Sequence, residues 1–528
     1  MNKKIFTIIM ILSVLMLPSC EDVLDQTPHT ETTSATVYAD AANYKAVLGK
    51  LYASFVIAGQ QRGGGAADLT SNSGQDYMRC YFNLQECGTD ELASTWLEGD
   101  NVGDLTYLSW DANDRWVSDM YYRIYYTISL CNEFLRNAGD DQIAKFTAAE
   151  QKEISQYKNE ARFIRALAYY HALDFFRNIP FVTEADPVGA FTPPRYQSKD
   201  IFTFIETELK DIETKLPNKA NGEYARASNA AAWTLLAKLY LNAAVYSGTP
   251  RYTDCITYCK KVITEGGYSL ESNYAKLFNA DNNLRTNEII FPLAVDAIHT
   301  TSWGSTTYII CGSVSNTSDY QKPGDYGVTS GWGMFRIRGE IPSLFDAKDG
   351  RGMFFTEGQT KGLDVIDNQT NGYYVEKFTN LTDAGETASN TVEGGVNTDY
   401  PMFRLADVYL MLAESTLRGG TGSSASEALG YVNQLRARAF GTNYETKGKI
   451  TGVQMDLKFI IDERARELYW EGTRRTDLVR FNLFTTKDYL WQWKGGTKDG
   501  QAVDNKYNYY PIPASDLTAN PNLKNEEY

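Results

Sequence analysis

The sequence predicts an all-α protein built from pairs of packed helices, with long ligand-binding loops and short minor strands between them. Three observations support this fold class. Apolar residues recur at helical spacing in several long segments. Stretches rich in Gly, Ser, Thr, Asn and Asp separate these segments. With 528 residues, 43% of them hydrophobic, the chain is long enough to bury an extended core.

The N-terminus has the pattern of an export signal. Two lysines precede an unbroken apolar run over residues 5–17, which has the length of a signal-peptide core but is too short to span a bilayer. The run leads into Leu-Pro-Ser-Cys, which is similar to a bacterial lipobox ending at Cys20. We predict a signal peptide over 1–19 and a lipid anchor on Cys20. The alternative is ordinary secretory cleavage near Ser19.

Two helical regions precede the middle of the chain. The segment 158–177 carries apolar residues at helical spacing and is predicted to end before Pro180. Segments that start at Asn229 and Tyr252 predict a helical hairpin, which a glycine stops at Gly266.

A third helical pair is predicted from Phe403, and a Gly/Ser turn leads from it into the segment 424–439. Alanines at the expected helix crossings and large aromatic residues at the helix ends resemble tetratricopeptide repeats, although the period is irregular. The scaffold is therefore expected to be a series of helical pairs.

Two long segments, about 59–101 and 279–400, are expected to be loop insertions that form the ligand face of a single domain over 20–528. They are rich in Gly, Ser, Thr, Asn and Asp, with short strand-like runs such as 288–295 and 307–312. Loops of this length in a compact protein are commonly functional. Their Trp and Tyr content argues against disorder.

Composition and motifs exclude several classes of function. The net charge of −15 disfavours nucleic acid as a partner. With three histidines and no Cys-x-x-Cys pair, the sequence predicts no metal site and no cofactor. A structural calcium would need ligands from distant loops, which spacing cannot pair. No disulfide is predicted.

No catalytic motif of the hydrolase, zinc-protease or nucleotide-binding type is present. Asp90 and Glu91 are adjacent and cannot flank a scissile glycosidic bond, so a helix cap or a structural hydrogen bond is their expected role. In the charged segment 463–481, Arg474 and Arg475 could bind an anion. The interleaved acidic residues favour an ion-pair network that stabilises helices.

Several long motifs follow one another along the chain: EARFIRALAYYHALDFFRNIPF from 160, AAWTLLAKLYLNAAVYSG from 231, FRLADVYLMLAE from 403, ERARELYWEGTRRTDLVRF from 463, LFTTKDYLWQWKGG from 483 and YYPIPASDL from 509. This series resembles the SusD/RagB family of surface glycan-binding lipoproteins of Gram-negative bacteria. The acidic pair after Cys20 is similar to the family's surface-export signal.

The resemblance implies a helical fold on tetratricopeptide-like pairs, long loops that carry the ligand site, and no enzymatic activity. It also implies a place at the cell surface on the outer membrane, where the lipid-anchored protein covers a TonB-dependent, SusC-like transporter as a lid.

The segments around Arg79, Trp303 and Trp332 resemble those of the starch-binding members of the family. The resemblance implies that the two tryptophans belong to an arc of aromatic side chains that holds a curved glucan, with Arg79 as a polar clamp. A third aromatic position of the arc falls on Ser94, and Trp96 is two residues further along. A shifted loop would bring Trp96 to that position.

Two further positions bear on the polar part of the site. Asp76 is a candidate for hydrogen bonding to sugar hydroxyls, and the position of a glycan-binding asparagine in the family falls on Gly99.

The chemistry of sugars gives the tryptophans an independent reason to be exposed. One face of a pyranose ring consists of C–H groups that pack on an aromatic plane, and its hydroxyls pair with Arg, Asp and amide groups. The alternative is that Trp303 or Trp332 folds inward as a loop anchor. Of the remaining tryptophans, those at 110, 116 and 233 lie in periodic or aromatic-rich contexts, and those at 491 and 493 alternate in a C-terminal element that is expected to be packed. These five are expected to be structural.

The sequence therefore predicts a lipoprotein that captures starch-like or related oligosaccharides and hands them to a transporter. The alternatives are capture of a non-starch glycan or of peptides, and a surface hydrolase.

Overall fold

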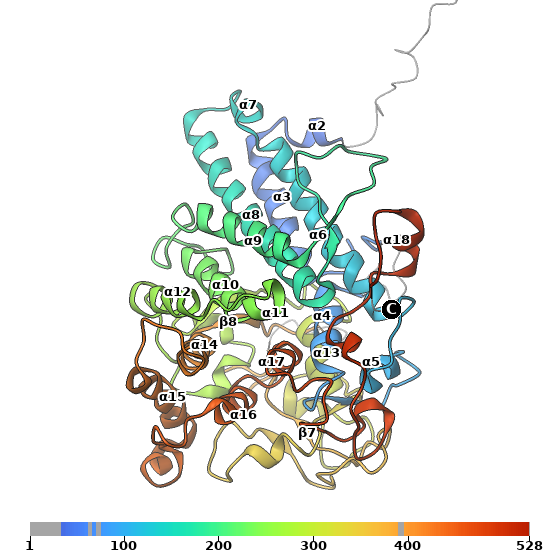
Figure 1. Ribbon diagram of the computed structural model, residues 1–528, viewed down its shortest axis with the longest axis vertical. Helices are drawn as coiled ribbons and strands as arrows, with labels where there is room; N and C mark the ends of the chain where they lie inside the picture. Colours follow the sequence, from blue (N-terminus) through green and yellow to red (C-terminus); the bar gives the residue numbers. More distant parts are fainter. Residues whose placement is uncertain (1–32, 62–65, 70–74, 389–394, 527) are drawn as a thin grey trace, which may run out of the picture.

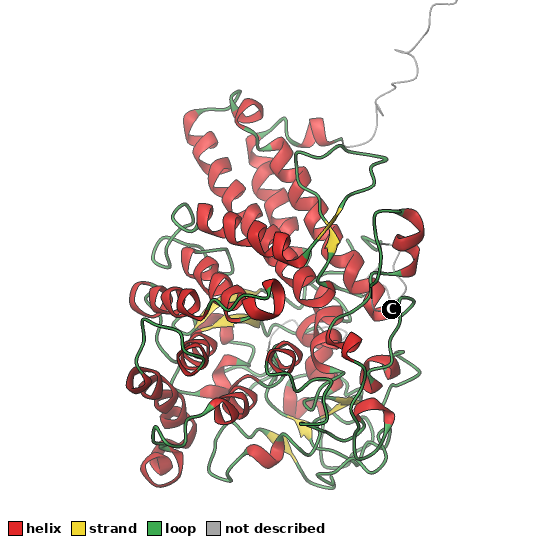
Figure 2. Cartoon of the chain, viewed as in Figure 1, coloured by secondary structure: helices red, strands yellow, loops and turns green. Residues whose placement is uncertain are grey.

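The computed structural model describes residues 33–61, 66–69, 75–388, 395–526 and 528, and shows a mostly helical protein with short strand pairs (Figures 1 and 2). The predicted signal peptide and Cys20 lie outside the described residues. Within the described part of the chain, no helix combines the length and the apolar character needed to cross a bilayer.

The upper part of the molecule in Figure 1 is a group of long helices: α3 (Ala41–Ala53), α6 (Arg115–Asn137), α8 (Ala148–Phe176) and α9 (Ser198–Ile212). The longest of them, α8, packs against the other three. It begins earlier than predicted, at a capping box in which Thr147 and Glu150 satisfy each other's backbone N–H groups. It ends at Phe176, before Pro180, as predicted.

The stack of helices continues on the left of Figure 1 through α10 (Asn229–Leu241), α12 (Tyr252–Glu265), α14 (Leu405–Leu417) and α15 (Ala425–Phe440). Each packs against the next in this order. The predicted hairpin is confirmed, and Gly266 is the C-cap of α12. The third predicted pair is also confirmed, except that Phe403 lies in a strand directly before the helix.

The remaining α-helices are shorter: α2 (Ser34–Val37), α4 (Tyr77–Glu86), α5 (Gly103–Tyr107), α7 (Asp140–Ile143), α11 (Ala243–Ser247), α13 (Ser305–Gly312), α16 (Leu457–Leu468), α17 (Arg474–Arg480) and α18 (Ala514–Ala519). Among them, α4 packs against α6, α13 and α17. This position brings the N-terminal, middle and C-terminal parts of the chain together.

The strands form short antiparallel pairs, as predicted for minor strands: β1 (Ala93–Ser94) with β5 (Phe335–Arg336), β2 (Ile179–Pro180) with β3 (Arg195–Tyr196), β4 (Ile289–Leu293) with β8 (Tyr400–Arg404), and β6 (Phe354–Phe355) with β7 (Tyr374–Val375). The strand-like run 288–295 is confirmed as β4. Its pairing with β8 joins the two ends of the long 279–400 segment.

Two of the predictions for the loop segments are wrong. The segment 59–101 contains the helix α4, and the strand-like run 307–312 is part of the helix α13. Every residue of both helices is buried. The sequence of α13 lacks the alternation of apolar and polar faces that marks a surface helix. The helix α4 is only 10 residues long and follows a glycine-rich stretch, whose composition predicts a loop.

The charged cluster at 463–481 forms the predicted ion-pair network, and it does so inside the protein. Arg404 bonds to Glu467 (Nη1 to Oε1, 2.6 Å), to Glu471 (Nε to Oε2, 2.6 Å) and to Glu288 (Nη1 to Oε1, 3.1 Å), with at most 4% of any of these side chains exposed. These residues come from β8, from α16 and the segment that follows it, and from the position before β4. The network therefore joins separate elements, where the sequence predicted stabilisation of helices.

Asp90 and Glu91 have structural roles, as predicted. Asp90 accepts bonds from Nε and Nη2 of Arg474 at 2.7 and 2.6 Å, and Glu91 accepts a bond from the backbone N–H of Trp470 at 2.9 Å. The six cysteines among the described residues are free and buried. In the same part of the chain, no group of three or more His, Cys, Asp or Glu side chains is placed to hold a metal ion.

Candidate functional site

Three tryptophans from loops that are far apart in the sequence meet at one place. The ring centroids of Trp96 and Trp332 are 6.5 Å apart with an interplanar angle of 18°. Those of Trp303 and Trp332 are 6.3 Å apart at 58°. Trp96 is 38% exposed and Trp303 is 44% exposed, whereas Trp332 is partly buried. We call these three residues the tryptophan platform, and it is bent between Trp303 and Trp332.

One buried carboxylate group, that of Asp76, anchors the loop that carries Trp303. Asp76 is the N-cap of α4, and it also accepts hydrogen bonds from the hydroxyl groups of Ser302 and Ser305 and from the backbone N–H of Ser305 at 3.3 Å. Gly304 lies so close that a Cβ atom there would be 2.2 Å from Asp76 Oδ1. Burial raises the pKa of Asp76, while the Ser302 hydroxyl lowers it.

A guanidinium group links the Trp303 loop to the Trp96 loop. Arg79 donates from Nη1 to the carbonyl oxygen of Trp303 at 2.8 Å and from Nη2 to Asp100 Oδ1 at 2.7 Å. Its guanidinium carbon lies 4.1 Å from the ring centroid of Tyr308 and 5.4 Å from that of Trp116. Two ion-pair or hydrogen-bond partners and two aromatic rings therefore hold Arg79 in one orientation.

Trp332 is fixed through its backbone. Its N–H donates to the carbonyl oxygen of Cys311 at 2.8 Å, and the N–H of Gly333 donates to the carbonyl oxygen of Val314 at 2.7 Å. Gly333 has a φ of +61°, which glycine adopts without strain. The Trp332 ring lies 6.3 Å from that of Tyr308 on α13. The C-terminal end of α13 therefore sets the position of this segment.

Trp96, two residues beyond Ser94, contributes the third ring of the platform. Ser94 is fully buried in β1, opposite Phe335 of β5, and its side-chain oxygen accepts a bond from the N–H of Trp96 at 3.0 Å. The N–H of Thr95 donates to the carbonyl oxygen of Met334 at 2.9 Å. These bonds bring the Trp96 loop next to Trp332.

All five predicted binding residues lie together, but two of them occupy positions that the sequence did not predict. Asp76 is 0% exposed and Arg79 is 6% exposed. Arg79 was expected in a glycine-rich loop, and it lies in the first turn of α4. Both side chains make their hydrogen bonds inside the protein, Asp76 as the cap of a buried helix start and Arg79 as a donor to Trp303 and Asp100.

Five other tryptophans were expected to be structural, and their burial agrees with this expectation. Trp110, Trp116, Trp233 and Trp491 are all buried, and Trp493 is partly buried. They therefore belong to the packing of the protein.

Sequence reasoning missed three residues of the site: Asp100, Gly304 and Tyr308. The glycine next to an isolated tryptophan was a possible signal, because glycine often marks a close approach of the backbone to another group. Tyr308 had no such signal, since its segment was predicted to be a strand.

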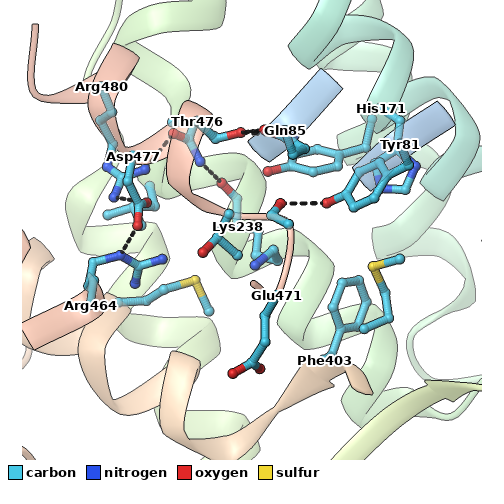
Figure 3. Close-up of a pocket in the computed structure, with 17 residues that line it drawn as sticks. Tyr81, Gln85, His171, Lys238, Phe403, Arg464, Glu471, Thr476, Asp477 and Arg480 are labelled. Atoms are coloured by element: carbon cyan, nitrogen blue, oxygen red, sulfur yellow. Dashed lines mark hydrogen bonds and ion pairs between the residues drawn. The ribbon is translucent and has the colours of Figure 1, made fainter. Parts of the chain in front are cut away.

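A second group of polar side chains surrounds a small cavity between α4, α8, α10 and α17 (Figure 3). The cavity has a volume of about 20 Å³, and its lining includes Tyr81, His171, Lys238 and Glu471. Burial lowers the pKa of His171 to about 3, so this imidazole is neutral. A space of this size holds about one water molecule, so the cavity cannot hold a sugar and belongs to the structural core.

The chain is similar to known proteins over nearly its whole length. A model of the SusD family matches residues 355–528, and a model described as "starch-binding associating with outer membrane" matches residues 60–241. The chain is 34% identical to the starch-binding protein SusD of Bacteroides thetaiotaomicron, over 96% of this chain and 95% of that protein. It is 26% identical to the SusD-like protein P25 of Formosa agariphila, over 96% and 95%.

Solved structures show the same fold. A SusD superfamily protein from Parabacteroides distasonis is similar with a TM-score of 0.70 and 22% identity, covering 94% of this chain and 100% of that one. Surface glycan-binding protein A from Bacteroides thetaiotaomicron, in complex with laminarihexaose, is similar with a TM-score of 0.69 and 17% identity, covering 92% and 99%. These likenesses confirm the helical fold predicted from the sequence. Together with the match over nearly the whole length of a curated relative, they establish that this chain belongs to the SusD family.

Proposed function

We propose that this SusD-family protein captures starch-like oligosaccharides on the tryptophan platform at the cell surface and passes them to a TonB-dependent transporter of the outer membrane. The family places the chain among non-catalytic surface glycan-binding proteins. The lipid anchor on Cys20 and the transporter are parts of the proposal that rest on the sequence pattern and the family resemblance.

The observation that carries the proposal is the bend of the platform. Trp96 and Trp332 are nearly parallel, and Trp303 is inclined by 58° to Trp332. Successive sugar rings can stack on both parts only if the chain itself changes direction between them. An α-1,4-linked glucan curves in this way, whereas a flat β-1,4-linked chain does not. Rigid aromatic rings supply this contact area at a low cost in conformational entropy.

The affinity is expected to be modest. Sugar hydroxyls exchange bonds with water for bonds with protein at little net gain, so we expect a dissociation constant between about 1 μM and 1 mM. Weak binding agrees with a role in delivery, because the sugar must leave for the transporter.

The test is a calorimetric titration of the chain without residues 1–20 against cyclic and linear maltooligosaccharides, laminarihexaose, cello-oligosaccharides and a peptide mixture. The double variant Trp303→Ala/Trp332→Ala is the control for the site, with far-ultraviolet circular dichroism as the control for folding. Binding of maltooligosaccharides that the double variant abolishes supports the proposal. Binding of laminarihexaose alone would move the specificity to a β-1,3-glucan.

Two results would contradict the proposal. Binding of peptides but of no glycan would refute the substrate class, and glycan binding that survives in the double variant would refute the site.

A further inference from the structure

We propose that Asp76 and Arg79 are positioning residues, which fix the angles between the three platform tryptophans and act on the glycan only through them. This inference rests on the proposed function for its meaning in binding. Its structural content, that the first turn of α4 sets the tryptophan geometry, can be measured without any ligand.

Asp76 binds the start of α4 through Oδ1 and the Trp303 loop through both carboxylate oxygens. Oδ1 accepts from the backbone N–H of Arg79 at 2.8 Å, which caps α4. Oδ2 accepts from the hydroxyl groups of Ser302 and Ser305, which lie on either side of Trp303 and Gly304. The carboxylate is fully buried, so it has no surface for a sugar. One side chain therefore ties the start of a buried helix to a surface loop.

The backbone of this loop is strained in a way that needs such support. Ser305 has a φ of +48°, which is uncommon for a residue with a side chain. Both its N–H and its hydroxyl donate to Asp76, at 3.3 and 3.2 Å. A strained residue persists only when surrounding contacts over-determine its conformation. The bonds to Asp76 thus hold the turn that aims Trp303 outward.

Arg79 connects this arrangement to the other two rings, those of Trp96 and Trp332. Through Asp100 it reaches the Trp96 loop, since the N–H of Asp100 donates to the carbonyl oxygen of Trp96 at 3.1 Å. Through its contact with Tyr308 it reaches Trp332, whose ring neighbours that of Tyr308. Tyr308 also donates to Asp100 Oδ2 at 3.2 Å.

Arg79, which is 6% exposed, therefore contacts the Trp303 loop and Asp100 of the Trp96 loop directly, and it reaches Trp332 through Tyr308. A binding surface that is held in its bound geometry loses less entropy when the ligand arrives, so its affinity depends on residues that never touch the ligand.

The first test displaces the Trp303 loop without altering either positioning residue. In Gly304→Ala the new Cβ would lie 2.2 Å from Asp76 Oδ1, so the loop must move. The matched control is Gly324→Ala in the 3₁₀ turn Pro323–Tyr326, where a Cβ would meet nothing within 4 Å.

We expect Gly304→Ala to change the near-ultraviolet circular dichroism of the ligand-free protein, where the tryptophans contribute, and to weaken glycan binding by about tenfold or more. The helical signal in the far ultraviolet should stay the same, and Gly324→Ala should behave as the wild type. An unchanged near-ultraviolet spectrum in Gly304→Ala would overturn the proposal, whether or not any glycan binds.

The second test asks whether Arg79 acts through the platform or on the ligand, with Arg79→Gln, Gly304→Ala and the double variant as a cycle. If both residues act through the orientation of Trp303, Arg79→Gln changes the ligand-free spectrum and the double variant binds no more weakly than the weaker single variant. If Arg79 contacts the sugar directly, its substitution leaves the ligand-free spectrum unchanged and the two losses of binding free energy add. That result would overturn the proposal for Arg79.

A third variant tests the contacts of Asp76 with the loop separately from its role as the cap of α4. Ser302→Ala removes a hydroxyl that donates to Asp76 and accepts from the N–H of Gly304 at 3.0 Å, and it leaves the cap bond to Arg79 in place. We expect the spectrum and the affinity to change in the same direction as in Gly304→Ala, with unchanged thermal stability of the helices. Wild-type binding and a wild-type spectrum in Ser302→Ala would contradict a role of Asp76 in positioning.

If the wild-type protein binds no glycan in the panel, the proposed function fails, and the ligand-free spectra still decide the positioning role. The two failures can therefore be told apart.

Discussion

Removal of the Trp303 ring tests the platform most directly. Trp303 is 44% exposed, and the loop that carries it is anchored through backbone and serine contacts rather than through the indole itself. Trp303→Ala should therefore remove contact area for the ligand and leave the loop in place. The loss of affinity can be worked out from that exposed area.

A fully exposed tryptophan offers roughly 250 Å², so an exposed fraction of 44% corresponds to about 110 Å². Covering all of this area with the apolar face of a sugar would stabilise the complex by about 2.8 kcal/mol at about 25 cal/mol per Å². A sugar that covers half of it would contribute about 1.4 kcal/mol. We expect Trp303→Ala to raise the dissociation constant between about tenfold and about a hundredfold.

The assay is calorimetric titration with maltoheptaose, and the matched control is Tyr196→Ala. Tyr196 is an aromatic residue on β3 that is 38% exposed and stacks on Phe181, away from the platform loops. The control should bind as the wild type does. A change of less than twofold in Trp303→Ala, with the wild type binding, would show that the exposed ring carries no ligand and that the area argument is wrong.

Three further predictions concern stability and localisation. Arg404→Met should lower the free energy of unfolding by about 3–5 kcal/mol in a denaturant titration, because it leaves Glu467 and its neighbours charged and buried without their partner. The control is Lys449→Met, which removes an exposed ion pair with at least 53% of each side chain accessible. It should change the free energy of unfolding by less than about 1 kcal/mol. Burial raises the pKa of Glu463, but three arginines outweigh it and hold this pKa at about 2. Its stabilising contribution is therefore complete above its unfolded pKa of about 4.5 and is lost as the pH falls towards 2, so the melting temperature should drop over this range, and a flat profile would contradict the network. Cys20→Ala should move the protein from the membrane fraction to the soluble fraction, and retention in the membrane would refute the anchor.

The sequence alone determined the helical scaffold, because the signals that predict a helix lie within the helical segment itself. The segment at 158–177 and the hairpin from Asn229 repeat apolar residues at the helical period, and Gly266 stops the second helix of the hairpin where expected. Each feature depends on residues within one or two turns of each other. The family resemblance extended this to the whole fold and to candidate residues of the site.

The same local signals failed for α4 and α13, which were expected as a loop and as a strand. The sequence of α13 lacks the contrast between an apolar and a polar face, because the helix is buried on every side. The helix α4 is short and follows the glycine-rich stretch from Gly59, whose composition predicts a loop. These two helices position the site: Asp76 caps α4, Arg79 lies in its first turn, and α13 follows the Trp303 turn.

Only the tertiary structure decided what the candidate residues do. Trp96, Trp303 and Trp332 are separated by long stretches of chain, and they meet because α4 packs against α13 and β1 pairs with β5. The same packing buries Asp76 and Arg79 under the platform, although their residue types alone suggested direct contact with sugar hydroxyls. Whether a side chain is buried, and which distant residues it meets, depends on how separate elements pack against each other. The pattern of residues within one segment does not contain this information.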